Sequence, residues 1–126
     1  MHILLAILGL GFLIFIHELG HYWVARRNGV KVQNFSIGFG PELFGWTAKS
    51  GTRWKVSALP LGGYVKMAGE NPEDQPQGAD DEFLSKSKWQ RFQILLAGPA
   101  MNMILAVLLL TLIALLTAGP LMKLLG

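Results

Sequence analysis

The sequence contains no cysteine and has few charged residues for its length. Without cysteine, the chain can have no disulfide framework, no thiolate zinc site and no cysteine nucleophile. Charged residues make up 15% of the 126 residues, whereas soluble domains average roughly 25%. No basic run interleaved with aromatic residues is present, so we expect no nucleic-acid partner. Apolar residues make up 52%, which excludes an intrinsically disordered chain and points to a membrane protein.

The apolar residues concentrate in two uncharged stretches, Ile3–Ile16 and Ile94–Leu116. An α-helix needs about 20 residues to cross a hydrocarbon core of about 30 Å. Segments 3–25 and 93–118 are both that long, so we predict an α-helical membrane protein with two transmembrane helices flanking a loop. A signal peptide is the alternative for the first segment, but no Lys or Arg precedes it and no A-x-A-like cleavage site follows.

The basic residues predict the orientation of these helices. Ten of the eleven Lys and Arg residues lie between the two apolar segments: Arg26, Arg27, Lys31, Lys49, Arg53, Lys55, Lys66, Lys86, Lys88 and Arg91. Short loops rich in Lys and Arg stay on the cytoplasmic side of a membrane. We therefore expect a cytoplasmic loop, both termini on the opposite side, and the lipid bilayer with its anionic headgroups as a partner.

The loop between the helices has three parts of different character. Segment 26–69 is predicted to be β-rich and to hold a small antiparallel sheet, because apolar residues alternate with small or polar ones and 49–52 resembles a hairpin turn. This sheet could lie at the membrane interface or form a small cytoplasmic hairpin domain. Segment 70–82 is acidic and is predicted to be a linker. Segment 83–92 is predicted to be a short amphipathic helix at the interface, and residues 119–126 a tail.

The first apolar segment contains three polar residues, His17, Glu18 and His21, in the order H-E-x-x-H. Four residues advance a helix by about 400°, so the two histidines lie one turn apart on one face and can share a zinc ion. Glu18 is rotated about 100° away, where it can activate zinc-bound water, as in metalloproteases. Alternatively, the histidines could be a structural pair, belong to a proton or ion pathway, or bind haem. Hydrolysis at this depth would require a water-filled cavity open to the cytoplasm.

Further motifs follow in order along nearly the whole chain. They are Gly38-Phe39-Gly40-Pro41, Leu59-Pro60-Leu61-Gly62-Gly63-Tyr64-Val65-Lys66-Met67, Trp89-Gln90-Arg91-Phe92, Ala97-Gly98-Pro99 and Asn102. With the H-E-x-x-H motif, this series resembles the site-2 proteases, which are intramembrane zinc metalloproteases, and specifically their RseP-like bacterial branch. The resemblance implies Zn²⁺ as cofactor, transmembrane proteins as substrates and a multi-pass position in a bacterial inner membrane.

The resemblance also implies roles for individual residues. His17 and His21 would be zinc ligands, and Glu18 the catalytic base. The β-rich segment is similar to the family's membrane-reentrant β-loop, which holds an extended substrate. Substrate-binding roles are implied for four further residues: Asn102, Gly98, Gly38 and Gly40. For Asn102 and Gly98, packing between helices is an equal alternative.

The sequence departs from the family pattern at the third zinc ligand. The family supplies an aspartate in an L-D-G motif on a later helix, after a PDZ domain, and neither is present among the 126 residues. We therefore expect the N-terminal half of an intramembrane metalloendopeptidase, with the other half supplied in cis or in trans and little activity in this part alone. The alternatives are a non-catalytic membrane-embedded binding module and a proton-coupled membrane subunit.

Overall fold

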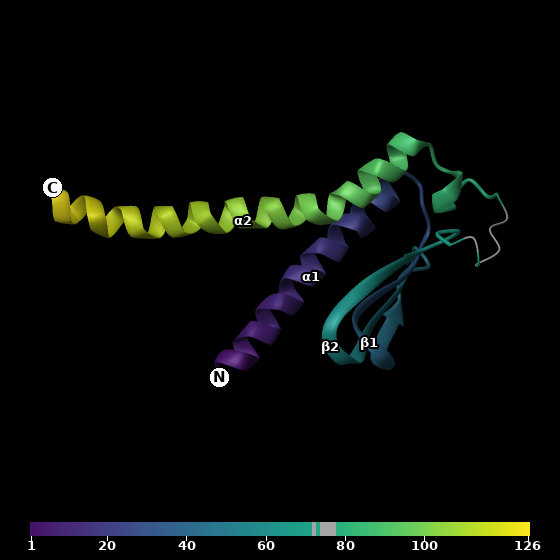
Figure 1. Cartoon of the computed structure of the whole chain (residues 1–126), viewed down its shortest axis with the longest axis horizontal. Helices are drawn as coiled ribbons and strands as arrows, with labels where there is room; N and C mark the ends of the chain where they lie inside the picture. Colours follow the sequence, from purple (N-terminus) through teal and green to yellow (C-terminus); the bar gives the residue numbers. More distant parts are fainter. Residues whose placement is uncertain (72, 74–77) are drawn as a thin grey trace.

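The computed structural model describes residues 1–71, 73 and 78–126. Its elements, in chain order, are helix α1 (His2–Arg27), strands β1 (Val32–Thr47) and β2 (Arg53–Met67), the 3-10 helix η2 (Phe83–Ser85) and helix α2 (Lys88–Leu125). Figure 1 shows α1 and α2 in contact near the end of α1 and diverging toward the two chain termini. The predicted combination of two long apolar helices with a small antiparallel sheet is confirmed.

Both helices are long and apolar enough to cross a membrane. α1 has 26 residues and α2 has 38, and most of the large apolar side chains on them are exposed in the isolated chain. The predicted helical segments 3–25 and 93–118 lie within these two elements. Apolar surface of this extent is typical of helices that face lipid or another protein.

The structure differs from the prediction of a separate interfacial helix at 83–92. A 3-10 turn covers Phe83–Ser85, and α2 then runs from Lys88 to Leu125 without a break, including most of the expected tail at 119–126. The reason is a capping box, in which the Gln90 amide donates to the Ser87 hydroxyl at 3.2 Å and the Ser87 amide to the Gln90 side chain at 3.1 Å. These bonds satisfy amides at the helix start, so the helix begins there.

The two strands form an antiparallel hairpin around the turn at residues 48–52, where the sequence predicted one. The Ala48 amide donates to the Thr52 carbonyl, and the Gly51 amide to the Ala48 carbonyl, both at 2.9 Å. Gly51 has a φ of 91°, a conformation that glycine adopts without strain. Glycine at this position therefore allows the tight reversal between β1 and β2.

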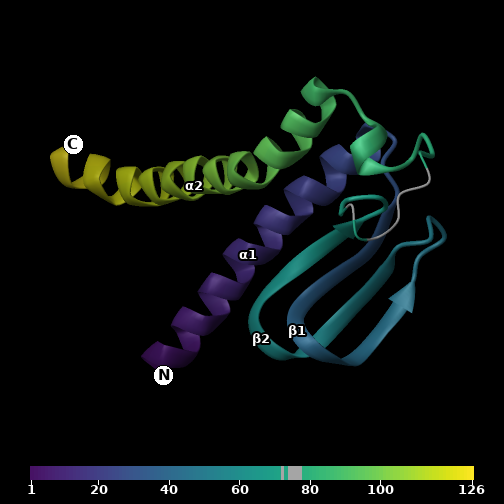
Figure 2. The same cartoon turned by 45° about the vertical axis from the view of Figure 1, so that its right-hand side comes forward.

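Each strand also doubles back near its middle. Asn34 is a register partner of both Arg53 and Lys66, so the first half of β1 lies between the two halves of β2. The reversals fall at glycine-containing segments, 38–41 in β1 and 58–62 in β2. Figure 2 shows these bends beside the N-terminal half of α1, while the 48–52 turn lies at the other end of the sheet. The sheet consequently extends alongside α1.

An aromatic cluster holds the sheet against α1. Phe35, only 1% exposed, lies at the centre of the core. Its ring is 5.7 Å from the rings of both Phe15 and Tyr22 on α1 and 4.5 Å from that of Trp54 on β2, measured between centroids. Aromatic pairs at such distances add to the stabilisation from burial. The cluster therefore fixes the position of the sheet relative to the H-E-x-x-H turn.

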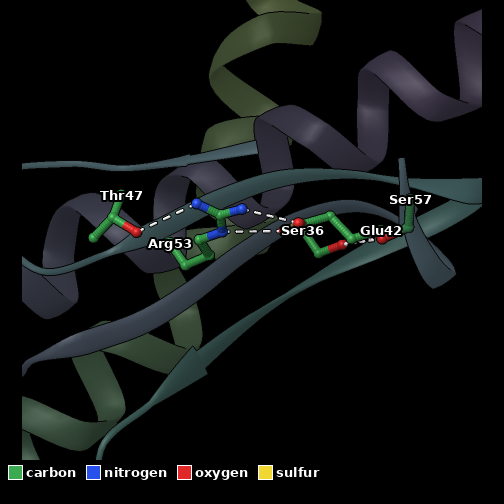
Figure 3. A network of polar contacts seen from close by, with 5 residues as sticks. All are labelled: Ser36, Glu42, Thr47, Arg53 and Ser57. Atoms are coloured by element: carbon green, nitrogen blue, oxygen red, sulfur yellow. Dashed lines mark hydrogen bonds and ion pairs between the residues drawn. The ribbon is translucent and has the colours of Figure 1, made fainter. Parts of the chain in front are cut away.

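Polar side chains join neighbouring parts of the sheet (Figure 3). Arg53 donates to both carboxylate oxygens of Glu42, at 3.1 and 2.9 Å, and also to the Thr47 hydroxyl at 3.4 Å. The Arg53 guanidinium lowers the pKa of Glu42 through this hydrogen bond and its charge. The buried hydroxyls of Ser36 and Ser57 are 3.1 Å apart. These contacts connect β1 to β2 on either side of the bends.

Candidate metal centre

His17 and His21 converge on one point beneath α2. Their Nε2 atoms are 3.1 Å apart, and their ring centroids are separated by 4.7 Å. This confirms the predicted placement of the two imidazoles on one face of α1. The two helices approach closely here, because a Cβ atom added to Gly20 would lie 2.6 Å from the Met101 side chain. Groups on α2 are thereby brought onto both imidazoles.

The outer nitrogen of His21 is held by the backbone of α2. Nδ1 of His21 donates to the Ile94 carbonyl oxygen at 2.7 Å. This bond favours the tautomer in which Nδ1 carries the proton, so Nε2 carries the lone pair: it can accept a hydrogen bond from His17 Nε2, 3.1 Å away, or bind a metal in its place. Ile94 was not identified from the sequence, since a backbone carbonyl leaves no residue-type signal.

Asn102 contacts the outer nitrogen of His17. Its Nδ2 is 3.3 Å from His17 Nδ1, while its Oδ1 is buried and has no hydrogen-bond partner among the described residues. Rotating the amide by 180° would exchange these two atoms, and Oδ1 could then accept a proton from His17 Nδ1. In that orientation, both histidines present a lone pair at Nε2.

Gly98 leaves the space around the two Nε2 atoms open. A Cβ atom added at this position would lie 2.7 Å from Nε2 of His17 and would also overlap the His21 ring. Carbon and nitrogen atoms that are not bonded do not approach so closely without displacement of one group. Glycine is therefore required here for both imidazoles to keep their lone pairs accessible.

The donor set fits two ligands of a zinc ion. Tetrahedral zinc with Zn–N bonds of about 2.0–2.1 Å holds two nitrogens about 3.3 Å apart, and the Nε2 atoms are within a few tenths of an ångström of that separation. The described residues bring no group of three or more His, Cys, Asp or Glu side chains together. At least one further ligand would therefore come from outside these residues.

Glu18 lies between the histidine pair and the sheet. With His17 and Asn102, it lines an open cavity of about 400 Å³ whose other walls are Leu10, Leu13 and Ile14. On its other side it borders a narrow crevice toward the bends of the sheet, and its carboxylate lies next to the Val65 backbone amide. The cavity is large enough for several water molecules. Water can therefore lie in contact with both the carboxylate and His17.

The structure brings five of the seven residues singled out by sequence together: His17, Glu18, His21, Gly98 and Asn102. Gly38 and Gly40 lie instead in the bend of β1, with φ values of 91° and 86°. A Cβ atom on Gly38 would lie 3.1 Å from the Ser57 carbonyl oxygen, and one on Gly40 would contact the Leu59 side chain at 3.7 Å. The neighbours of these two glycines are thus residues of β2.

The family model described as "Peptidase family M50" matches residues 5–125, which is nearly the entire chain. The chain belongs to peptidase family M50. The match includes both helices, the sheet and the histidine pair, so this membership agrees with the geometry of the site.

Several curated relatives are similar to this M50 chain. A Brucella suis protein named as a zinc metalloprotease is 49% identical over 75% of the chain. A Clostridium acetobutylicum protein with the same kind of name is 50% identical over 86% of the chain. The regulator of sigma-E protease RseP from Escherichia coli is 50% identical over 80% of the chain. The matched parts make up 28%, 31% and 23% of these relatives' own lengths. The chain thus spans less than a third of each relative.

Proposed function

We propose that this chain is the N-terminal part of an intramembrane zinc metalloendopeptidase that hydrolyses peptide bonds of transmembrane proteins. The observation that carries the proposal is the pair of Nε2 atoms 3.1 Å apart on the turn that carries Glu18, with an open cavity lined by both His17 and Glu18. The names of the relatives, zinc metalloproteases and a protease that regulates sigma-E, support this assignment.

In this proposal, His17 and His21 hold the zinc ion through Nε2. The Ile94 carbonyl and the Asn102 amide orient the two rings through Nδ1. A third ligand, the aspartate of a later helix, is supplied in cis or in trans by residues outside those described. When bound, zinc supplies Lewis acidity, which acidifies a water molecule and polarises the scissile carbonyl.

Glu18 moves the protons of the reaction. Its carboxylate accepts a proton from a water molecule in the cavity as the water oxygen forms a bond to the carbonyl carbon of the substrate. The protonated Glu18 then donates that proton to the amide nitrogen as the C–N bond breaks, so an amine and a carboxylic acid are formed. The acid then gives its remaining proton to the amine or to water, and a carboxylate leaves. The position of Glu18 at the wall of the cavity, next to His17, supports this role.

We infer that α1 and α2 cross a bacterial inner membrane with the connecting loop in the cytoplasm. Three observations support this placement: the length and apolar character of both helices, their exposed apolar side chains, and the basic residues Arg26, Arg27, Lys86 and Lys88 at the ends that the loop joins. The bends of the sheet lie beside the N-terminal half of α1 (Figure 2). The sheet would therefore reach membrane depth.

The sheet would position the substrate in an extended conformation. A peptide bond inside a helix is shielded by its own hydrogen bonds, so the substrate must unwind before it reaches the metal. Strand addition beside Val65, whose backbone lies next to Glu18, would satisfy the freed backbone groups. Gly38 and Gly40 would shape the bend of this platform, while Gly98 and Asn102 lie against the histidine pair from α2.

The test is the substitution Glu18→Gln in the full-length protein that carries this chain. We expect cleavage of a transmembrane substrate to be lost, because the glutamine side chain cannot accept a proton from water. Zinc should be retained, because Glu18 is not one of the proposed zinc ligands. The control His17→Ala should lose both zinc and cleavage. Normal cleavage by the Glu18→Gln variant would refute the proposed mechanism.

A non-catalytic membrane-embedded binding module is the second candidate. It is favoured by the lack of a third metal ligand among the described residues. This candidate predicts that the full-length protein binds its partner equally well with Glu18→Gln or after removal of zinc, and that it cleaves nothing. Cleavage that depends on Glu18 would exclude it.

A further inference from the structure

A second cavity lies where the end of α1 meets the beginning of α2. It is an open groove of about 430 Å³, and none of its lining residues comes from the sheet. Arg27, Asn28 and Gln93 form one end of the groove, at the loop-facing ends of the helices. Val24, Leu96 and Ala100 line the other end, deeper along both helices. The groove is thus polar and cationic at one end and apolar at the other.

The polar end has hydrogen-bonding capacity for an anion. No described acidic side chain forms an ion pair with Arg27, which is exposed at the last residue of α1. The side-chain amide nitrogen of Asn28 donates a hydrogen bond to the Val24 carbonyl oxygen, at 2.9 Å. A second cation, Lys86, lies beside the residue that follows Asn28, because its ammonium would be 3.2 Å from a Cβ atom added to Gly29. The charges at this end are complementary to a phosphate group.

Two exposed tryptophans indicate the level of the groove relative to a bilayer. Trp23, four residues before Arg27, is 62% exposed, and Trp89, four residues before Gln93, is 65% exposed. Exposed tryptophans at helix ends are typical of the headgroup region of a membrane. The polar end of the groove would therefore lie at the depth of the lipid phosphates, and its apolar end at the depth of the acyl chains.

We propose that this groove binds one anionic phospholipid. The headgroup phosphate contacts Arg27 and Gln93, and an acyl chain lies along Val24, Leu96 and Ala100, between the two helices. Basic pockets between helices on the cytoplasmic side are suited to such headgroups. The inference rests on the membrane placement proposed above, but it is independent of the histidine pair and of catalysis.

The experiment measures lipid binding to the detergent-solubilised chain by native mass spectrometry. The chain is titrated with phosphatidylglycerol and, separately, with phosphatidylcholine. We expect saturable binding of one phosphatidylglycerol molecule, about fivefold tighter than phosphatidylcholine, because one Arg–headgroup contact has about that effect. Arg27→Gln should remove the preference.

The chain provides matched controls for both ends of the groove. Arg26 has the same charge and is adjacent in sequence, but its guanidinium faces Tyr22 at 3.1 Å instead of lining the groove. Arg26→Gln should therefore keep the preference for phosphatidylglycerol. Ala100→Leu should fill the apolar end of the groove and weaken the binding of both lipids. Ala106→Leu, at an exposed site outside the groove, should leave the binding of both lipids unchanged.

Three results would overturn the lipid site. They are the absence of a preference for phosphatidylglycerol, binding that does not saturate, and equal effects of Arg26→Gln and Arg27→Gln, which would indicate diffuse attraction to charge. Flotation of the chain with phosphatidylglycerol vesicles tests the membrane placement separately. Failure to float would refute the placement and the site together, whereas flotation without selective binding would refute the site alone.

Discussion

Asn102 provides the sharpest test of the metal centre. The contact between its amide and His17 Nδ1, at 3.3 Å, implies that Asn102 would orient His17 in the proposed zinc site. Leucine has a similar shape but neither accepts nor donates a hydrogen bond. In the variant Asn102→Leu, the zinc-binding tautomer of His17 would have no protein acceptor for its Nδ1–H. We therefore expect this variant to bind zinc more weakly.

The size of the effect follows from the lost hydrogen bond. Loss of an outer partner of a metal-bound histidine lowers metal affinity about 10–100-fold, or about 1.4–2.8 kcal/mol. The bond from His21 to the Ile94 carbonyl, at 2.7 Å, remains in the variant and should keep the second ligand in place.

The assay is competition for zinc between the purified protein and a chromophoric chelator. Asn102→Asp should retain the affinity of the unmodified protein, because its carboxylate can accept the proton of His17 Nδ1. Met103→Leu, at an exposed neighbouring site, serves as the control for general effects on α2. If Asn102→Leu binds zinc as tightly as the unmodified protein while only KM for substrate rises, Asn102 acts on the substrate and our reasoning is refuted. Nitrogen chemical shifts of His17 would report the tautomer directly.

Two further predictions concern Gly98 and Glu42. Gly98→Ala should abolish zinc binding in the same competition assay, since the added methyl group would lie 2.7 Å from His17 Nε2; retained affinity would show that α2 can shift away. Glu42 has its pKa lowered by Arg53, so their pair stabilises the sheet above the ordinary pKa of Glu and loses this effect as the pH falls through the lowered value. Because the pair is exposed, the effect should be small: tryptophan fluorescence, followed from about pH 7 to about pH 3, should show a slight change that Glu42→Gln removes. An identical change in the variant would contradict this.

The features that sequence predicted correctly depend on local patterns. The lengths of the two apolar stretches predicted the two helices, and the four-residue spacing of His17 and His21 predicted that both rings lie on one face of α1. The turn at 48–52 followed from glycine between two alternating segments. Each of these depends on residues close together in the chain, so periodicity and turn chemistry are sufficient to predict it.

The features that sequence did not predict depend on residues far apart or on the backbone. The doubling back of both strands requires pairing of Asn34 with two distant partners, which alternation alone does not specify. The bond from His21 to the Ile94 carbonyl involves no distinctive side chain. The start of α2 has a local signal, the S-x-x-Q pattern of Ser87 and Gln90. The onset of the apolar stretch at 93 predicts a later start for the second long helix, and the capping pattern overrides it.

The two helices contribute different parts of the proposed metal site, so metal affinity and helix association depend on each other. α1 carries both histidines, whereas α2 supplies the Ile94 carbonyl, the Asn102 amide and the open space at Gly98. A ligand that binds only the docked pair must stabilise docking, by about 1.4 kcal/mol for each tenfold excess over its dissociation constant. In the proposed metal site, zinc would therefore stabilise the association of α1 and α2 to the extent that it binds the docked pair more tightly than α1 alone. Conversely, a substitution that loosens the crossing of the helices at Gly20 should weaken zinc binding.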